Sequence, residues 1–136
     1  MQINEIMSKN VEYLNKSKSV KEAAQLMQKS DCGSIPVEEN DKLIGMITDR
    51  DLALRILAEG KSADTPISEC INGSIKYCFD DQSVEEVASQ MSELKIRRMP
   101  VMNRDKKLVG IVSLGDLATS QSARDKTAEV YKNIAR

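Results

Sequence analysis

The chain has 136 residues, of which 40% are hydrophobic and 30% charged, and its formal net charge is −1. This composition is typical of one globular domain, or of two small halves that share a core. The balanced charge and the 3% of aromatic residues argue against a nucleic-acid surface, and no apolar run approaches the roughly 20 residues of a membrane span. The N-terminus lacks the basic start and apolar stretch of a signal peptide, so the sequence predicts a soluble cytoplasmic protein.

The side-chain inventory also limits the chemistry. The chain has no histidine, which removes Ser–His and Cys–His nucleophile pairs and most zinc sites. Its three cysteines, Cys32, Cys70 and Cys78, are widely spaced and odd in number, which argues against a disulfide scaffold. Reduced thiols that serve as small apolar residues are the favoured interpretation, and a redox role for Cys32 is the minor one. We expect no enzyme activity, no metal site and no required cofactor.

In chain order, each half of the sequence begins with a short extended segment, predicted at residues 11–14 and 75–79. A helix follows, and the capping-box pattern Ser-x-x-Glu marks its start. The two boxes are Ser19/Glu22 and Ser83/Glu86. Apolar residues then recur at i, i+3, i+4 and i+7, which predicts a helix with one buried face. They are Val20, Ala23, Ala24 and Met27 in the first half, and Val84, Val87, Ala88 and Met91 in the second.

Two strands and a second helix complete each half. The first strand is centred on Ile35-Pro36-Val37 or Met99-Pro100-Val101, where the proline indicates an edge or an irregularity. The next strand, residues 43–47 or 108–112, is continuously apolar, which predicts burial on both faces. Its central glycine, Gly45 or Gly110, predicts the close approach of another backbone. A second helix is expected after Thr48 and after Ser113, and Gly60 is the expected C-terminal cap of the first of these.

The order β-α-β-β-α therefore occurs twice, which predicts an α/β (α+β) fold. We expect the two repeats, residues 1–60 and 61–120, to pack sheet-to-sheet as one pseudo-two-fold module, because each is too small to bury enough surface alone. Residues 61–66 form a short polar connector at the start of the second repeat. Residues 121–136 are expected to form a C-terminal helical extension that caps the module or contacts a partner. Its apolar face would hold Ala123, Thr127, Val130 and Ile134.

The residues that can carry chemistry follow the second apolar strand of each repeat. Thr48 is followed three residues later by Asp51, and Ser113 by Asp116. This pattern is a helix cap in one interpretation, with the carboxylate near the positive end of the helix dipole. In the other, the carboxylate accepts hydrogen bonds from the hydroxyls of a ribose, and the Thr or Ser hydroxyl and first-turn amides hold a phosphate or ribose oxygen.

Arginines near these pairs differ between the repeats. Arg97-Arg98 precedes Met99, whereas Gly33-Ser34 stands at the same place in the first repeat. Arg50 lies within the first Thr-x-x-Asp pattern, and Gly115 replaces it in the second. These arginines are either solvated surface residues or bidentate phosphate ligands. If both repeats bind a ligand, the sequence predicts that they bind it unequally.

The repeated h-Pro-Val followed by Leu-h-Gly-h-h-(Thr/Ser)-x-x-Asp-Leu, where h is hydrophobic, resembles a tandem CBS-domain pair, or Bateman module. Residues 3–7 and 67–71 are similar to the linker that precedes the family's first strand. The resemblance covers about residues 1–120 and includes no other domain, as in a stand-alone CBS pair. It implies a regulatory module that senses an adenosine ligand, such as AMP, ADP, ATP or S-adenosylmethionine, in clefts between the repeats. It also implies a homodimer that pairs through helices.

The resemblance further implies which residues contact the ligand. Asp51 and Asp116 would bind the ribose, with Thr48 and Ser113 as the nearby hydroxyls. In the family, basic residues just before the h-Pro pair bind phosphate. Arg50 is a further candidate phosphate ligand on the grounds of its own chemistry. The remaining implied contacts are the pocket-lining pairs Ile35-Pro36 and Met99-Pro100, the phosphate ligands Arg97 and Arg98, and the base contacts near Val11 and Ile75.

Two other functions stay open from the sequence. The protein can be a dimeric scaffold whose clefts bind nothing, and which recruits an unidentified protein partner through the dimer or residues 121–136. It can also be an enzyme or redox sensor, which the missing histidine and scattered cysteines disfavour.

Overall fold

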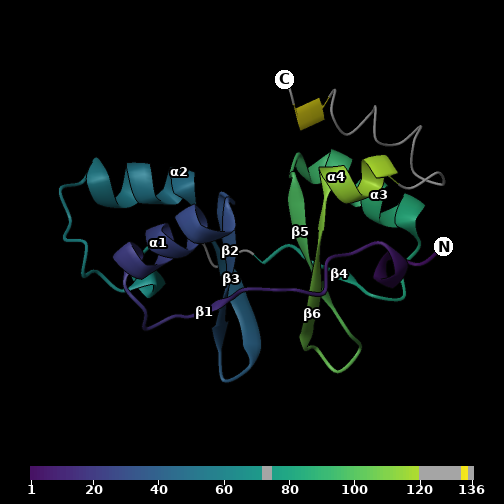
Figure 1. Cartoon of the computed structure of the whole chain (residues 1–136), viewed down its shortest axis with the longest axis horizontal. Helices are drawn as coiled ribbons and strands as arrows, with labels where there is room; N and C mark the ends of the chain where they lie inside the picture. Colours follow the sequence, from purple (N-terminus) through teal and green to yellow (C-terminus); the bar gives the residue numbers. More distant parts are fainter. Residues whose placement is uncertain (72–74, 120–132, 135–136) are drawn as a thin grey trace. The chain divides into compact units, whose positions relative to one another are not determined.

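The computed structural model describes residues 1–71, 75–119 and 133–134. The chain divides into two compact units (Figure 1). The first-repeat unit is Glu12–Ile75, and the second-repeat unit combines Met1–Val11 with Lys76–Arg136. The compact units do not coincide with the sequence repeats. The repeat boundaries at residues 60 and 120 stay a prediction.

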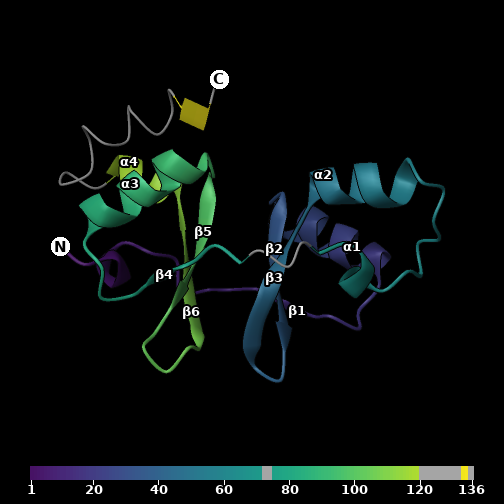
Figure 2. The same ribbon diagram turned by 180° about the vertical axis from the view of Figure 1, so that it is seen from behind.

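The first-repeat unit is built on a three-stranded sheet with the order β1-β2-β3. β2 pairs parallel with β1 and antiparallel with β3. The helices α1 and α2 lie on one side of this sheet (Figures 1 and 2). The elements are β1 (Leu14–Asn15), α1 (Val20–Ser30), β2 (Ser34–Glu39), β3 (Lys42–Thr48), α2 (Asp49–Asp51) with its π-helical continuation η2 (Leu52–Leu57), and the 3-10 turn η3 (Ile67–Glu69).

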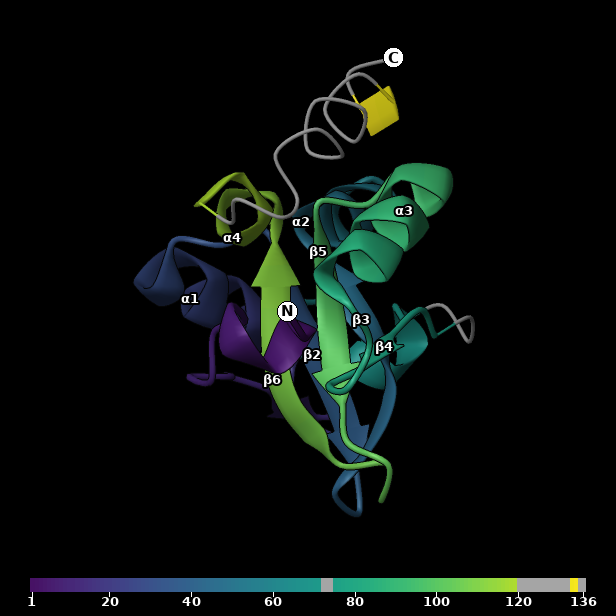
Figure 3. The same ribbon diagram turned by 90° about the vertical axis from the view of Figure 1, so that its right-hand side faces the viewer.

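The second-repeat unit has the same plan, with a sheet of order β4-β5-β6. β5 pairs parallel with β4 and antiparallel with β6, and α3 and α4 lie on one side of this sheet (Figure 3). The elements are η1 (Ile3–Glu5), β4 (Cys78–Phe79), α3 (Val84–Leu94), β5 (Arg98–Met102), β6 (Leu108–Ser113) and α4 (Leu114–Thr119). The predicted α+β class and the β-α-β-β-α order of each repeat are confirmed.

The first strand of each repeat is shorter than predicted. Pairing to the sheet begins only at Leu14 in β1 and at Cys78 in β4, each for two residues. Val11 and Ile75 are half-buried but precede these strands, so the predicted strands at 11–13 and 75–77 were wrong. Extended apolar segments look alike in sequence whether or not a partner strand satisfies their backbone, and only the pairing decides where a strand begins.

Each of the two prolines lies in a part of its central strand that pairs with only one neighbouring strand. Pro36 pairs with Met46 of β3, but β1 joins β2 only from Val37 onward. Pro100 likewise pairs with β6 before β4 begins to pair at Val101. A residue without an amide hydrogen is tolerated at such an edge-like position. The predicted irregularity is also present, since the register shifts at Val37/Glu38 and at Val101/Met102.

The apolar strands β3 and β6 are not buried evenly on both faces. In β3, Leu43 and Ile47 are buried, whereas Ile44 and Met46 are half-buried. In β6, burial is continuous from Gly110 to Val112 and only partial before it. The prediction of full burial on both faces was therefore too strong for β3, because alternate side chains of a strand meet different surroundings.

The hydrophobic core of each unit contains a 3-10 turn that belongs, in sequence, to the other repeat. Ile3 of η1 is fully buried in the core around α3, β5 and β6, and Ile67 of η3 is fully buried in the core around α1, β2 and β3. Backbone bonds fix both turns, with Ile3 N donating to Gln82 O at 2.8 Å and Ile67 N donating to Lys18 O at 2.8 Å. The segment at the N-terminus thus completes the second-repeat unit, and the segment after the connector completes the first.

Gly110 lies where a neighbouring backbone passes close to β6, as predicted. Ser8 forms an antiparallel bridge with Ile111, in which Ser8 N donates to Ile111 O at 2.8 Å and Ile111 N donates to Ser8 O at 3.0 Å. A Cβ at Gly110 would lie 2.9 Å from the Ser8 carbonyl oxygen and 2.5 Å from Met7 Sδ. The glycine therefore makes room for the N-terminal segment to pair with β6.

The predicted helix caps form with one difference between the repeats. Ser19 and Glu22 make a complete capping box at α1. At α3, the Ser83 hydroxyl accepts from Glu86 N at 3.1 Å and contacts Glu86 Oε1 at 3.2 Å, while the backbone of this region pairs with the N-terminal segment. Gly60 has a φ of +68° after η2, in agreement with its predicted role as a C-terminal cap.

The C-terminal part of the chain is described only at 133–134. Asn133 donates a hydrogen bond from its side-chain amide to Ser92 Oγ, and Ile134 packs against the core of the second-repeat unit. Ser92 is itself buried on α3. The rest of the predicted extension at 121–136, including its proposed apolar face, lies outside the described residues. Among the helices of the described ranges, none is long and apolar enough to cross a membrane.

Candidate functional site

The first hydroxyl–carboxylate pair lies where β3 passes into α2. Asp51 Oδ2 accepts hydrogen bonds from Thr48 N and Thr48 Oγ1, both at 2.9 Å. The Thr48 hydroxyl in turn accepts from Asp51 N at 3.1 Å. Both side chains are partly exposed, and Arg55 Nε lies 3.8 Å from Asp51 Oδ1. The pair is therefore held rigidly at the end of a buried strand.

The second pair, at the junction of β6 and α4, repeats two of these three hydrogen bonds. Asp116 Oδ2 accepts from Ser113 N at 2.9 Å, and Ser113 Oγ accepts from Asp116 N at 3.2 Å. Both residues are half-buried. The capping interpretation is thus realised in both repeats. Capping uses Oδ2 in each case, and a carboxylate carries lone pairs on both oxygens, so capping and acceptance of a ligand hydroxyl are compatible.

Arg98 lies directly opposite Ser113. The two residues form a register pair across β5 and β6, so their side chains leave the same face of the sheet. The Nε of Arg98 is buried and has no hydrogen-bond partner among the residues that the structure describes. A buried guanidinium donor without an acceptor is costly. The predicted residues Arg98, Ser113 and Asp116 are therefore brought together, and the Nε donor of Arg98 is left without an acceptor among the described residues.

The corresponding place in the first-repeat unit carries different side chains. Ser34 pairs with Thr48 where Arg98 pairs with Ser113. Arg97 and Arg50 are exposed. Arg50 lies between Thr48 and Asp51 in sequence, whereas Arg97 is placed near the second pair by the strand pairing, where Arg97 O accepts from Leu114 N at 3.0 Å. Sequence reasoning gave no role to Asp49, whose carboxylate lies over Gly33. The available signal was an acidic residue directly after Thr48, at the position of Leu114 in the second repeat.

Other predicted site residues are placed in or near the cores. Ile35 is 1% exposed and Met99 is 0% exposed, and each belongs to the core of its unit. Their side chains therefore support the strands from beneath. Pro36 and Pro100 are also buried, and alternation along the strand puts them on the faces of Ser34 and Arg98.

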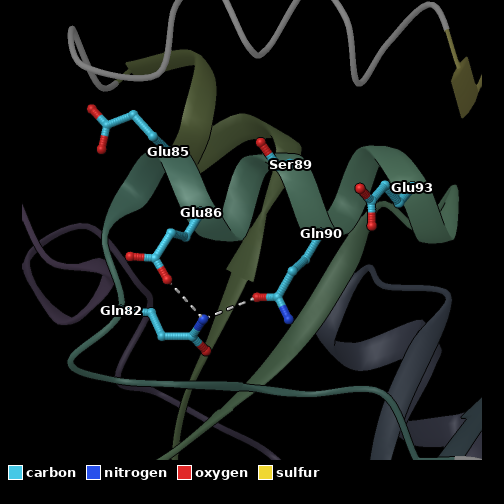
Figure 4. A pocket seen from close by; sticks show the side chains of 6 residues that line it. All are labelled: Gln82, Glu85, Glu86, Ser89, Gln90 and Glu93. Carbon is cyan, nitrogen blue, oxygen red and sulfur yellow. Dashed lines mark hydrogen bonds between the residues drawn. The ribbon is translucent and has the colours of Figure 1, made fainter.

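A shallow open pocket lies on the outer side of α3 in the second-repeat unit (Figure 4). Gln82 Nε2 bridges two of its residues, donating to Glu86 Oε2 and Gln90 Oε1 at 3.4 Å each. The lining residues are Gln82, Glu85, Glu86, Ser89, Gln90 and Glu93. None of them belongs to the predicted set, and three carboxylates do not suit a phosphate. In the described ranges, no group of three or more His, Cys, Asp or Glu side chains is arranged to hold a metal ion.

The buried thiols have the properties of core residues. Burial raises the pKa of Cys78 from 9.0 to about 12, and its Sγ lies 3.9 Å from Pro100 O. Burial also raises the pKa of Cys70, and the nearby Asp51 charge adds to the increase. Cys32 is half-buried. The thiolate is the reactive form of cysteine, so a raised pKa opposes a redox role for Cys70 and Cys78.

We predict that Cys78 resists alkylation in the folded protein at pH 8, where a thiol with a pKa near 12 is ionised in only about one molecule in ten thousand. The pKa of Cys78 is higher in the folded than in the unfolded protein. The contribution of the buried neutral thiol to the free energy of unfolding is therefore complete below about pH 9 and declines as the pH rises toward 12. Mass spectrometry after iodoacetamide treatment measures labelling at each cysteine. Labelling of Cys78 at the rate found in denaturant would contradict the assignment.

A model of the family described as "CBS domain" matches residues 3–58 and again residues 67–122. The chain belongs to the CBS-domain family. It is 36% identical over 133 residues to the CBS domain-containing protein YhcV of Bacillus subtilis, with 98% of this chain and 94% of that protein covered. It is 35% identical over 116 residues to Hypoxic response protein 1 of Mycobacterium tuberculosis, with 84% of this chain and 80% of that protein covered.

Solved CBS structures agree with this assignment. Hypoxic Response Protein I, described with two coordinated zinc ions, matches with a TM-score of 0.79 at 33% identity and covers 87% of this chain and 97% of its own. The CBS domain pair of MJ0100, in complex with 5′-methylthioadenosine and S-adenosyl-L-methionine, matches with a TM-score of 0.76 at 30% identity and the same coverages of 87% and 97%. The predicted tandem CBS pair is confirmed.

Proposed function

We propose that this CBS pair is a non-catalytic regulatory module that binds an adenosine-containing ligand next to its hydroxyl–carboxylate pairs. Thr48 with Asp51 would form one site, and Ser113 with Asp116 the other. The observation that carries the proposal is the unpartnered Arg98 Nε beside Ser113, because a buried donor without an acceptor is satisfied by an anionic ligand. The adenosine ligands of the similar MJ0100 pair add support.

The proposed roles follow from the chemistry of each group. Asp51 and Asp116 accept hydrogen bonds from the vicinal hydroxyls of the ribose, as acidic residues do in other nucleotide sites. The cap fixes both carboxylates in position, since Thr48 N and Oγ1 donate to Asp51 Oδ2 and Ser113 N donates to Asp116 Oδ2. Arg98 supplies a planar donor for a phosphate oxygen. We assign no bond-breaking step to these residues, so ligand binding itself is the regulatory event.

Replacing Asp116 with asparagine is expected to weaken ligand binding about ten- to hundredfold, because hydrogen bonds to a charged acceptor contribute about 1.5–3 kcal/mol. Asparagine keeps an oxygen that accepts from Ser113 N, so the unfolding free energy should change by less than about 1 kcal/mol. Calorimetry with AMP, ADP, ATP, S-adenosylmethionine and 5′-methylthioadenosine measures binding, and thermal unfolding measures stability.

The matched variant in the other repeat is Asp51→Asn, which should affect a separate binding event. A loss of stability without a loss of affinity in either variant would assign the carboxylates to capping alone. If none of the five compounds binds ligand-free protein at millimolar concentration, the proposed function is wrong.

A scaffold role through a homodimer is the second candidate, and exposed leucines on η2 favour it. Leu57 is 80% exposed and Leu54 is 49% exposed, in a unit whose other large aliphatic side chains are mostly buried. We expect Leu57→Glu to convert a dimer into a monomer, because an interface core does not tolerate an unpaired charge. Sedimentation velocity of both proteins measures this. A monomeric parent protein would remove the homodimer from the proposal.

A further inference from the structure

The two repeats place opposite charge beside equivalent hydroxyl–carboxylate pairs. The first repeat carries two aspartates and one arginine there, and the second carries two arginines and one aspartate. The first set is Asp49, Arg50 and Asp51, and the second is Arg97, Arg98 and Asp116. Because the duplicated backbone is so similar, these side chains are what distinguishes the two sites.

One backbone hydrogen bond gives Asp49 a defined place. Asp49 N donates to Gly33 O at 2.9 Å, and Leu114 N donates to Arg97 O at 3.0 Å in the other repeat. Asp49 and Leu114 are therefore equivalent, as are Gly33 and Arg97. Leu114 turns into the core of its unit, where it is 8% exposed. Asp49 instead stays exposed at the surface.

Gly33 and Asp49 occur together for a steric reason. A Cβ at Gly33 would lie 2.8 Å from Asp49 Oδ2 and 3.2 Å from its Cγ, so a side chain at position 33 would displace the carboxylate. Arg50 N donates to Asp49 Oδ1 at 2.9 Å, which holds the other oxygen. The carboxylate thus lies over the start of β2, next to Ser34, the counterpart of Arg98.

We propose that Asp49 makes the first-repeat site reject phosphate-bearing adenosine ligands, so that this site takes neutral or cationic ones while the second-repeat site takes phosphorylated ones. This inference rests on the proposed function. In the first repeat, a phosphate would meet a fixed carboxylate where the second repeat offers the Arg98 guanidinium, and like charges in contact disfavour binding. Asp49 is then a specificity-determining residue, and Gly33 is the residue that makes room for it.

The experiment compares two probes, AMP and 5′-methylthioadenosine. AMP carries a charged phosphate at the 5′ position, and 5′-methylthioadenosine carries an uncharged methylthio group there. The chain carrying Asp116→Asn reports on the first-repeat site, and the chain carrying Asp51→Asn reports on the second. Calorimetry is done at fixed ionic strength. We expect the first-repeat site to bind 5′-methylthioadenosine about tenfold or more tightly than AMP, and the second-repeat site to prefer AMP.

Adding Asp49→Asn to the Asp116→Asn chain should strengthen AMP binding about three- to tenfold, since one partly solvated like-charge contact is removed. Binding of 5′-methylthioadenosine should stay unchanged. Asparagine keeps an acceptor for Arg50 N, so thermal unfolding should also stay unchanged. Raising the salt concentration should narrow the gap between AMP affinities with and without Asp49, which a purely structural role would not produce.

Three outcomes overturn the inference. Equal affinity of the first-repeat site for the two probes would do so, as would an equal effect of Asp49→Asn on both probes. Both of these leave the proposed function standing, because the site still binds adenosine ligands. Absence of binding by either probe to the unmodified chain would overturn the proposed function and the charge selectivity together.

Discussion

Ile3→Ala is expected to lower the free energy of unfolding by about 2–5 kcal/mol, a large fraction of the total stability of a small protein. The Ile3 side chain is fully buried, and its removal leaves a cavity in the core formed by α3, β5 and β6. The effect should therefore fall on the second-repeat unit, although residue 3 belongs to the first repeat in sequence. Chemical denaturation measures the total, and hydrogen exchange locates it.

The matched control is Ile67→Ala, because Ile67 is the equivalent residue of η3 and is also fully buried. Its loss should destabilise the first-repeat unit by a similar amount. Exchange should rise in α3 and β5 for Ile3→Ala, and in α1 and β2 for Ile67→Ala. The opposite assignment would mean that each turn packs on the repeat next to it in sequence.

Gly110→Ala is expected to cost about 1–3 kcal/mol of stability, the range for overpacking a filled site. The new methyl group would lie 2.9 Å from the Ser8 carbonyl oxygen. That carbonyl accepts from Ile111 N, and Ser8 N donates to Ile111 O, so the Ser8 backbone cannot move away without the loss of hydrogen bonds. The contact with Met7 Sδ, at 2.5 Å, is easier to relieve because that side chain is flexible.

Gly115→Ala is the matched control for this prediction. Gly115 lies in α4, and apart from its chain neighbours and the backbone of its own helix, the nearest described atom to a new Cβ is Ser113 Oγ at 3.5 Å. Alanine is favoured over glycine in a helix, so this change should stabilise the protein by up to about 1 kcal/mol. Thermal and denaturant unfolding of both variants test the pair. Equal responses would show that close backbone approach is not the reason for Gly110.

Local signals in the sequence predicted the elements well because each has a local physical cause. Ser19 with Glu22 satisfies amide groups at a helix start, and Gly60 supplies a positive φ at a helix end. The apolar spacing of α1 and α3 follows from burying one face. These features need no knowledge of the rest of the chain, and their repetition in the same order was enough to indicate the family.

What the sequence did not reveal depends on contacts between distant segments. Nothing local to Ile3 states which repeat its side chain enters, and both cores accept an isoleucine. The predicted candidates Ile35 and Met99 had the right sequence neighbours, but strand alternation turns them into the cores. The position of Asp49 over Gly33 depends on the pairing of β2 with β3, so it emerged only with the structure.

The exchange of the two 3-10 turns separates the unit of duplication from the unit of folding. The first-repeat unit is one continuous stretch of chain, Glu12–Ile75, whereas the second must be assembled from both ends of the sequence. A cut at residue 60 would leave each product without a turn that its own core requires. The two copies therefore depend on each other for folding, since the loss of either sequence repeat would also remove part of the hydrophobic core of the other unit.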